Sequence, residues 1–220
     1  HGIWVTLLRT AIGTPLAVLF TTMLAYVLSR EDLLWKKGLN LLFVFTMYFG
    51  GGMVPYYMVL KNLGMLNNFI VFIFPNIISV YNMILVKNYI EGMPKEIFES
   101  SKIDGANDLV IFFKIVFPLS KPIIMTIALF VAVMHWNSWF DAYLYTNSQS
   151  LKTMQSILVE ILNQYQTSSA NQAANQAGQQ LTPDSIRMAA TMIATIPIIM
   201  VYPFIQKYFV KGIMLGSVKS

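Results

Sequence analysis

The chain has 220 residues, of which 56% are hydrophobic and 11% are charged, and its mean hydropathy is +0.58. Soluble domains usually carry about 25% charged residues, so this composition excludes a water-soluble fold and indicates an integral membrane protein. The absence of cysteine and the presence of only two histidines argue against disulfides, thiolate chemistry and an imidazole-rich metal site. The net charge is +5, but the basic residues are scattered and form no stripe, so nucleic acid is not an expected partner.

Five apolar runs have the length of membrane spans. They cover residues 3–28, 39–60, 69–90, 110–145 and 186–205. The second run contains three glycines at 50–52 and then Pro55, which should bend or break it. Irregular backbone at membrane depth requires protein or a water-lined cavity beside it, so we expect this span to avoid lipid. The sequence therefore predicts an all-α, polytopic helical bundle that forms a single transmembrane domain over residues 1–220.

Lysine and arginine are concentrated on one side when the five spans alternate across the bilayer. By the positive-inside rule, the segment 91–122 and the C-terminus are cytoplasmic, and the N-terminus of this fragment lies outside. An external N-terminus predicts a sixth span, missing at the N-terminus. The stretch 147–183 is then external, with an amphipathic helix over 151–165 and a Gln/Asn/Ala/Ser-rich loop over 166–180.

The cytoplasmic segment 91–122 contains the most informative pattern in the sequence. A short helix should begin after Pro94 and end at Gly105, and a second helix should re-enter the membrane past Pro118. On the first helix, helical spacing would place three residues on one apolar face that a soluble partner could bind in a groove. That face comprises Ile97, Phe98 and Ser101.

The spacing in this segment resembles the EAA loop of binding-protein-dependent ABC importer permeases. The matching residues are Glu99, Ser100, Ser101, Gly105, Ile115 and Pro118. Two serines replace the usual pair of alanines, and Phe117 stands where leucine is usual; both changes preserve size or apolar character. The likeness extends to segments 25–30, 50–55, 135–142 and 202–212. Together these segments resemble the carbohydrate-uptake branch of the family, which includes maltose-type and oligosaccharide permeases.

The resemblance implies a type I importer fold and a set of partners in the cell membrane of a prokaryote. These are membrane lipid, a second homologous permease in a heterodimer, two cytoplasmic ATPase subunits, an external solute-binding protein and a carbohydrate substrate. The ATPases would bind ATP and Mg, whereas this chain would bind no cofactor, hold no metal and contribute no catalytic residue. Consistently, the sequence lacks a glycine-rich phosphate-binding loop followed by Lys-Ser or Lys-Thr. The residues implied in coupling to the ATPases are Ile97, Phe98, Glu99, Ser100, Ser101, Asp104, Gly105 and Ala106.

Polar and aromatic residues at membrane depth are candidates for the substrate pathway. They are Asn82, Trp136, Asn137, Trp139 and Asp141. Aromatic faces beside hydrogen-bonding groups suit a sugar, but an interfacial aromatic belt explains the tryptophans as well, and hydrogen bonding between helices explains Asn82. Arg9 is expected to snorkel or to pair with a neighbouring chain, and His135 to be a hydrogen-bonded helix residue.

Two other functions remain open from the sequence. One is an ABC permease for a non-sugar solute, such as an amino acid or phosphate. The other is a secondary transporter or channel subunit that needs no ATPase, which would be expected to show inverted repeats or paired intramembrane carboxylates. Neither feature is evident in the sequence.

Overall fold

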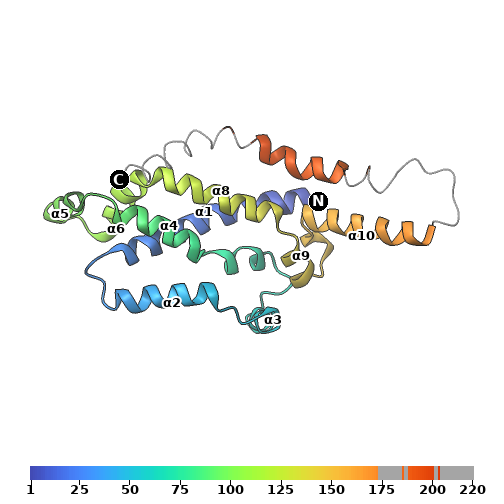
Figure 1. Cartoon of the computed structure of the whole chain (residues 1–220), viewed down its shortest axis with the longest axis horizontal. Helices are drawn as coiled ribbons and strands as arrows, with labels where there is room; N and C mark the ends of the chain where they lie inside the picture. The colour runs from blue at the N-terminus through green and yellow to red at the C-terminus, as the bar shows by residue number, and fades with distance from the viewer. Residues whose placement is uncertain (173–184, 186–187, 201–202, 204–220) are drawn as a thin grey trace.

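The computed structural model describes residues 1–172, 185, 188–200 and 203, and over this part of the chain the regular structure is helical, without strands (Figure 1). Helix α1 (Gly2–Ser29) continues through Pro15 over 28 residues, a length of about 42 Å at 1.5 Å per residue. Among the described helices, it is the one that is long and apolar enough to cross a bilayer alone. The first predicted span is therefore confirmed as a helix.

The second predicted span is broken at its glycines, as expected. Helices α2 (Lys36–Tyr48) and α3 (Met53–Asn62) meet at an angle of 112°, and Gly52 has a φ of +87° that favours glycine. However, α2 has no buried residue and the glycines at 50–52 are exposed. Within the described chain, no other element covers this break.

The third span consists of two short 3-10 helices and one α-helix. These are η1 (Phe69–Phe72), η2 (Phe74–Asn76) and α4 (Val80–Glu91), and the span bends by 42° where α4 begins. Ser79 caps α4, because its hydroxyl accepts a hydrogen bond from the amide of Asn82 at 3.3 Å.

The fourth predicted span, 110–145, is wrong as a single helix. Its first part comprises α6 (Asp108–Ile111), the π-helical turn η3 (Phe112–Val116) and α7 (Phe117–Leu119). This part lies at 81° to α8 (Lys121–Asn137), and α9 (Phe140–Tyr145) follows as a separate helix. Pro118 and Pro122 flank the sharp bend, where each removes an amide hydrogen from the helix ladder.

The core lies where α1, α4 and α8 pack side by side (Figure 1). Its fully buried side chains include Leu28, Val86, Ile90, Phe112 and Ile127. The segment α5 (Lys95–Ile103) lies at one end of these helices, and α9 lies at the opposite end beside the N-terminus (Figure 1). The two ends are thus joined by one continuous helix, α1.

The stretch after α9 is more helical than the sequence predicts. A 3-10 turn, η4 (Gln149–Leu151), precedes α10 (Met154–Gln172), which extends through the first seven residues of the predicted loop 166–180. The rest of that loop, 173–180, lies outside the described residues. Of the last predicted span, 186–205, the structure describes the helix Met188–Met200. Residues 186–187, 201–202 and 204–220 lie outside the described residues.

Candidate functional site: helix α5 and the recess between α9 and α10

Helix α5 begins and ends where the sequence predicts. Pro94 is its N-cap, and Gly105 follows its last turn with a φ of +75°. The amide of Gly105 donates to the carbonyl of Lys102 at 3.0 Å, and the amide of Ala106 donates to the carbonyl of Ser101 at 3.0 Å. These bonds satisfy carbonyls that the end of a helix leaves free, so the turn after α5 has a defined shape.

The expectation that Ile97, Phe98 and Ser101 form a free apolar face is corrected by the structure. Ser101 is buried, and Phe98 packs against the core of this chain. The reason is that α5 lies against the ends of the transmembrane helices, which occupy its apolar side. A partner can instead reach the opposite side, where Ile103 is 86% exposed and Glu96, Glu99, Ser100 and Asp104 are also exposed.

A network of ion pairs joins α5 and the turn after it to the end of α1. Arg30, the C-cap of α1, donates from Nε to Asp32 Oδ1 at 2.9 Å and from Nη2 to Asp32 Oδ2 at 2.6 Å. The same guanidinium pairs with Asp108 at the start of α6. The hydrogen bonds from Arg30 lower the pKa of Asp32 to about 2, so Asp32 stays ionised at neutral pH.

Further ion pairs reach α5 itself. Lys102 Nζ lies 3.7 Å from Asp32 Oδ2, and Lys95 Nζ lies 2.5 Å from Glu31 Oε1. These pairs border a pocket of about 320 Å³ between α1, α4 and α5. The sequence shows the charges at 30–32 but not their partners, because the pairs join residues far apart along the chain.

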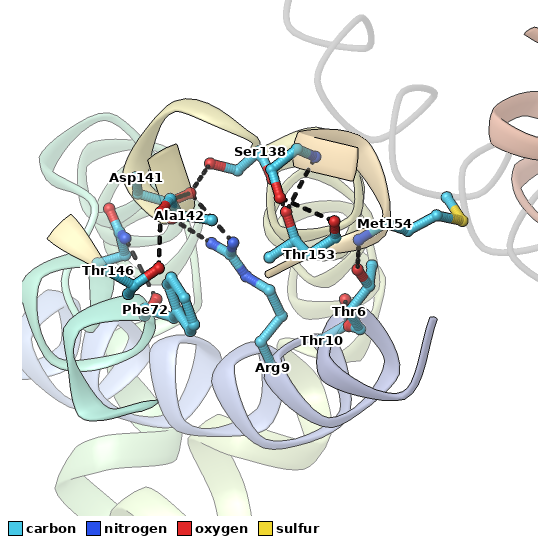
Figure 2. Close-up of polar contacts among 12 residues, drawn as sticks. Thr6, Arg9, Thr10, Phe72, Ser138, Asp141, Ala142, Thr146, Thr153 and Met154 are labelled. Atoms are coloured by element: carbon cyan, nitrogen blue, oxygen red, sulfur yellow. Dashed lines mark hydrogen bonds and ion pairs between the residues drawn. The ribbon is translucent and has the colours of Figure 1, made fainter. Parts of the chain in front are cut away.

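A buried ion pair lies at the other end of α1 (Figure 2). Arg9 is fully buried, and its two Nη atoms donate to the carboxylate of Asp141 at 3.2 and 2.5 Å. Its guanidinium also lies 4.7 Å from the ring centre of Phe72. The expectation that Arg9 snorkels or pairs with a neighbouring chain is therefore wrong: its partner is 132 residues away in the same chain.

His135 is buried against α1 and does not form the hydrogen bonds expected of it. Neither of its ring nitrogens has a hydrogen-bond partner among the described residues. Its ring lies so close to Gly13 that a Cβ on that glycine would come within 2.5 Å of Nε2. Packing against a glycine, a contact that sequence spacing does not reveal, explains its position.

The predicted pathway residues do not form one cluster. Trp136 donates from Nε1 to the carbonyl of Ala194 at 3.0 Å, and Asn137 donates to the carbonyl of Val133 in its own helix at 3.0 Å. Asn82 is buried on α4. Its cap residue Ser79 contacts Thr21 of α1, and Thr21 lies about 18 Å along α1 from Arg9, so Asn82 is far from the Arg9–Asp141 pair. Of the five, Trp139 and Asp141 come together at the start of α9.

An open recess of about 880 Å³ lies between α9 and α10. Tyr143 of α9 and Trp139, the N-cap of that helix, line it, with ring centres 6.2 Å apart. On α10, Ser156 and Glu160 face them, and Glu160 forms an ion pair with Lys152. Of the residues that line the recess, the sequence predicts only Trp139 as a site residue, because the facing polar residues belong to a different helix.

Both the sequence and the fold match known proteins. The family model of the binding-protein-dependent transport system inner membrane component matches residues 3–215. The chain belongs to this family. It is accordingly a membrane-embedded ABC transporter permease, a translocation subunit, which confirms the fold class and family indicated by the sequence.

Several relatives of the permease, among them YtcP, have names that refer to carbohydrate transport. It is 44% identical over 211 residues to the polygalacturonan/rhamnogalacturonan transport system permease protein YtcP of Bacillus subtilis, covering 96% of this chain and 74% of that one. It is 40% identical over 221 residues to the protein LplC of the same organism, covering 98% and 73%. A chain in the crystal structure of a bacterial ABC transporter involved in the import of the acidic polysaccharide alginate superposes with a TM-score of 0.83 and 28% identity, covering 94% of this chain and 74% of that one.

Proposed function

We propose that the permease is a subunit through which an ATP-driven importer moves an oligosaccharide or related carbohydrate into the cell. The observation that carries this proposal is the geometry of α5, a short capped helix that ends at Gly105 and presents an exposed side at one end of the molecule. The printed functions of YtcP and of the alginate importer support a carbohydrate substrate.

Two partner ATPase subunits bind ATP and Mg, and they contact this chain at α5 and the turn after it. The exposed Glu99, Ser100 and Asp104 contact the ATPase directly. Phe98 instead holds α5 against its own chain. Ser101 donates to the carbonyl of Ile97 within the helix, and Gly105 and Ala106 fix the turn that follows. Because the ATPases are cytoplasmic, α5 lies on the cytoplasmic side of the membrane, and α9 and α10 at the other end face the external solute-binding protein.

A second permease completes the membrane domain. The bend at residues 50–52 is exposed in this chain alone, and backbone groups there require protein or water as partners within a bilayer. The apolar side chains of α2 and α3, including Leu41, Phe45 and Val54, are exposed as well. A heterodimer partner covers this surface.

The recess between α9 and α10 receives the saccharide on the outer side. The aromatic faces of Trp139 and Tyr143 suit the C–H faces of a sugar ring, and the polar side chains of α10 suit its hydroxyl groups. Asn82 on α4 and Trp136 and Asn137 at the end of α8 belong to the rest of the substrate path. Asp141 supports the recess through Arg9 rather than contacting substrate.

Uptake into proteoliposomes tests this function. The full-length permease would be reconstituted into proteoliposomes with its second permease, ATPases and binding protein. Trigalacturonate or maltotriose would be added on the side of the binding protein, and ATP on the side of the ATPases. We expect ATP-dependent accumulation of at least one of these saccharides. Uptake that is independent of ATP and follows an ion gradient would instead support the secondary transporter.

A further inference from the structure

Helix α1 has an arginine near each end, and each arginine is held by a carboxylate from a distant segment. Arg9 pairs with Asp141 of α9, 132 residues away, and Arg30 pairs with Asp108 of α6, 78 residues away. Within the described residues these are the two arginines of the chain. They are 21 residues apart, which corresponds to about 32 Å along a helix, close to the thickness of the hydrocarbon core.

α1 is also the stiffest described connection between the two ends of the molecule. The other described spans bend by 112°, 42° and 81°, whereas α1 is one uninterrupted helix. A bent span can absorb a displacement at its break, but a continuous helix packed in the core passes it on. Figure 1 shows α5 and α9 at opposite ends of this helix.

The inner clasp, formed by Arg30, Asp32 and Asp108, attaches α1 to the turn that follows α5. Asp108 is the first residue of α6, three residues after Gly105. Lys102, in the last turn of α5, lies 3.7 Å from Asp32 and adds a contact to the same group. A movement of α5 therefore reaches Arg30 through charged groups on both sides of the turn.

The outer clasp, formed by Arg9, Asp141 and Phe72, attaches the other end of α1 to α9 (Figure 2). The guanidinium donates to both carboxylate oxygens, which fixes its orientation as well as its distance. Asp141 Oδ1 also accepts hydrogen bonds from the Ser138 hydroxyl and the Ala142 amide, both at 2.9 Å. Asp141 is thereby fixed to the helix that carries Tyr143 into the recess.

We propose that α1 is the strut that transmits movement of the coupling helix to the outer recess, and that Arg9 and Arg30 are the positioning residues that attach it. This inference rests on the proposed function, because it assumes that ATPases move α5. Both clasps stay closed as α1 shifts, so α9 moves with the turn after α5. The wall of the recess thus changes position when ATP binds at the other end.

A thiol-labelling experiment tests the strut without requiring the identity of the substrate. The chain has no cysteine, so a Phe140→Cys variant places its one thiol on α9, at a position that is 45% exposed. The complete importer in proteoliposomes would be labelled with a maleimide before and after trapping with ATP, Mg and vanadate. With intact clasps, we expect trapping to change the labelling rate severalfold.

Variants of each clasp should remove that response. Asp108→Asn weakens the inner clasp at an exposed site, and Arg9→Met combined with Asp141→Leu removes the outer one. The double change is used because replacing a buried ion pair by apolar groups preserves folding better than leaving one charge unpaired. Lys87→Gln is the matched control, because it removes an ion pair within α4 while Glu91 keeps Lys36 at 3.0 Å.

The strut is supported if trapping alters labelling with intact clasps and in Lys87→Gln, but not in the clasp variants. It is overturned if trapping has no effect with intact clasps, if the clasp variants respond normally, or if Lys87→Gln also loses the response. Saccharide uptake by the unmodified importer is measured separately. Normal uptake with an unaltered response in the clasp variants would refute the strut and leave the proposed function standing.

Discussion

Gly105 adopts a φ of +75° in the turn that joins α5 to α6, and apart from its chain neighbours no heavy atom of the described residues lies within 4 Å of the place where its Cβ would be. A side chain there meets backbone strain and no steric clash, and a β-branched residue in this conformation costs about 1–2 kcal/mol. We expect Gly105→Val to uncouple ATP hydrolysis from transport. Gly105→Asn should retain most coupling, because asparagine tolerates the left-handed region; equal activity of the two variants would contradict this role.

Asp32 makes the inner clasp insensitive to pH down to strongly acidic values. Its pKa is lowered to about 2 by hydrogen bonds from Arg30, so its contribution to folding is complete above the unfolded pKa of about 3.9 and disappears as pH falls toward 2. We therefore expect the labelling response of Phe140→Cys to be the same at pH 7.5 and pH 5. A response that disappears between these values would show that another group controls the clasp.

Single residues also show where sequence reasoning stops. The break at Gly50–52, the start of α5 at Pro94 and its end at Gly105 were predictable, because proline and glycine impose local backbone restrictions. The partner of Arg9 was not, because Asp141 is 132 residues away and no local rule joins them. A charged residue at membrane depth is predicted to be paired or functional, but the sequence does not show which residue it pairs with.

Two glycines in helices provide a matched test of packing. A Cβ on Gly13 would come within 2.5 Å of the buried ring of His135, whereas a Cβ on Gly38 in α2 would meet no described residue within 4 Å outside its own helix turn. We expect Gly13→Ala to destabilise the protein by about 1–3 kcal/mol through overpacking. Gly38→Ala should stabilise it by up to about 1 kcal/mol, because alanine is the better helix former.

Thermal unfolding in detergent measures both changes. For a chain of this size, each kcal/mol corresponds to roughly 2–4 °C in Tm. A fall in Tm for Gly13→Ala and a small rise for Gly38→Ala would confirm that α1 and α8 are in close contact at this point. Equal Tm values for the two variants would contradict the packing.

At the level of elements, apolar runs located the spans but not their shapes. α1 matched its run closely, whereas the run 110–145 was divided into segments at 81° and a separate α9. Hydropathy records whether residues suit the membrane, and a run of apolar residues does not distinguish a straight helix from one bent between two prolines. The sequence predicts a partner on the apolar face of α5, because it does not show which side of that helix the chain's own core occupies.

For the whole molecule, the two candidate functional regions lie at opposite ends, with α5 at one end and the recess beside α9 at the other. Under the proposed function, ATP hydrolysis at α5 and substrate movement at the recess must therefore be coupled through the helices between them. The EAA spacing was sufficient to predict the family, since it depends on residues within one short segment. The recess could not be predicted in full, since its walls come from two helices.

Co-purification of the full-length permease in mild detergent, with ATP hydrolysis measured on the purified sample, tests the importer function most directly. We expect a second permease and an ATPase to accompany it, and a binding protein loaded with trigalacturonate or maltotriose to raise ATP hydrolysis severalfold. A permease that purifies alone and stable, and whose saccharide uptake is indifferent to ATP, would contradict this function.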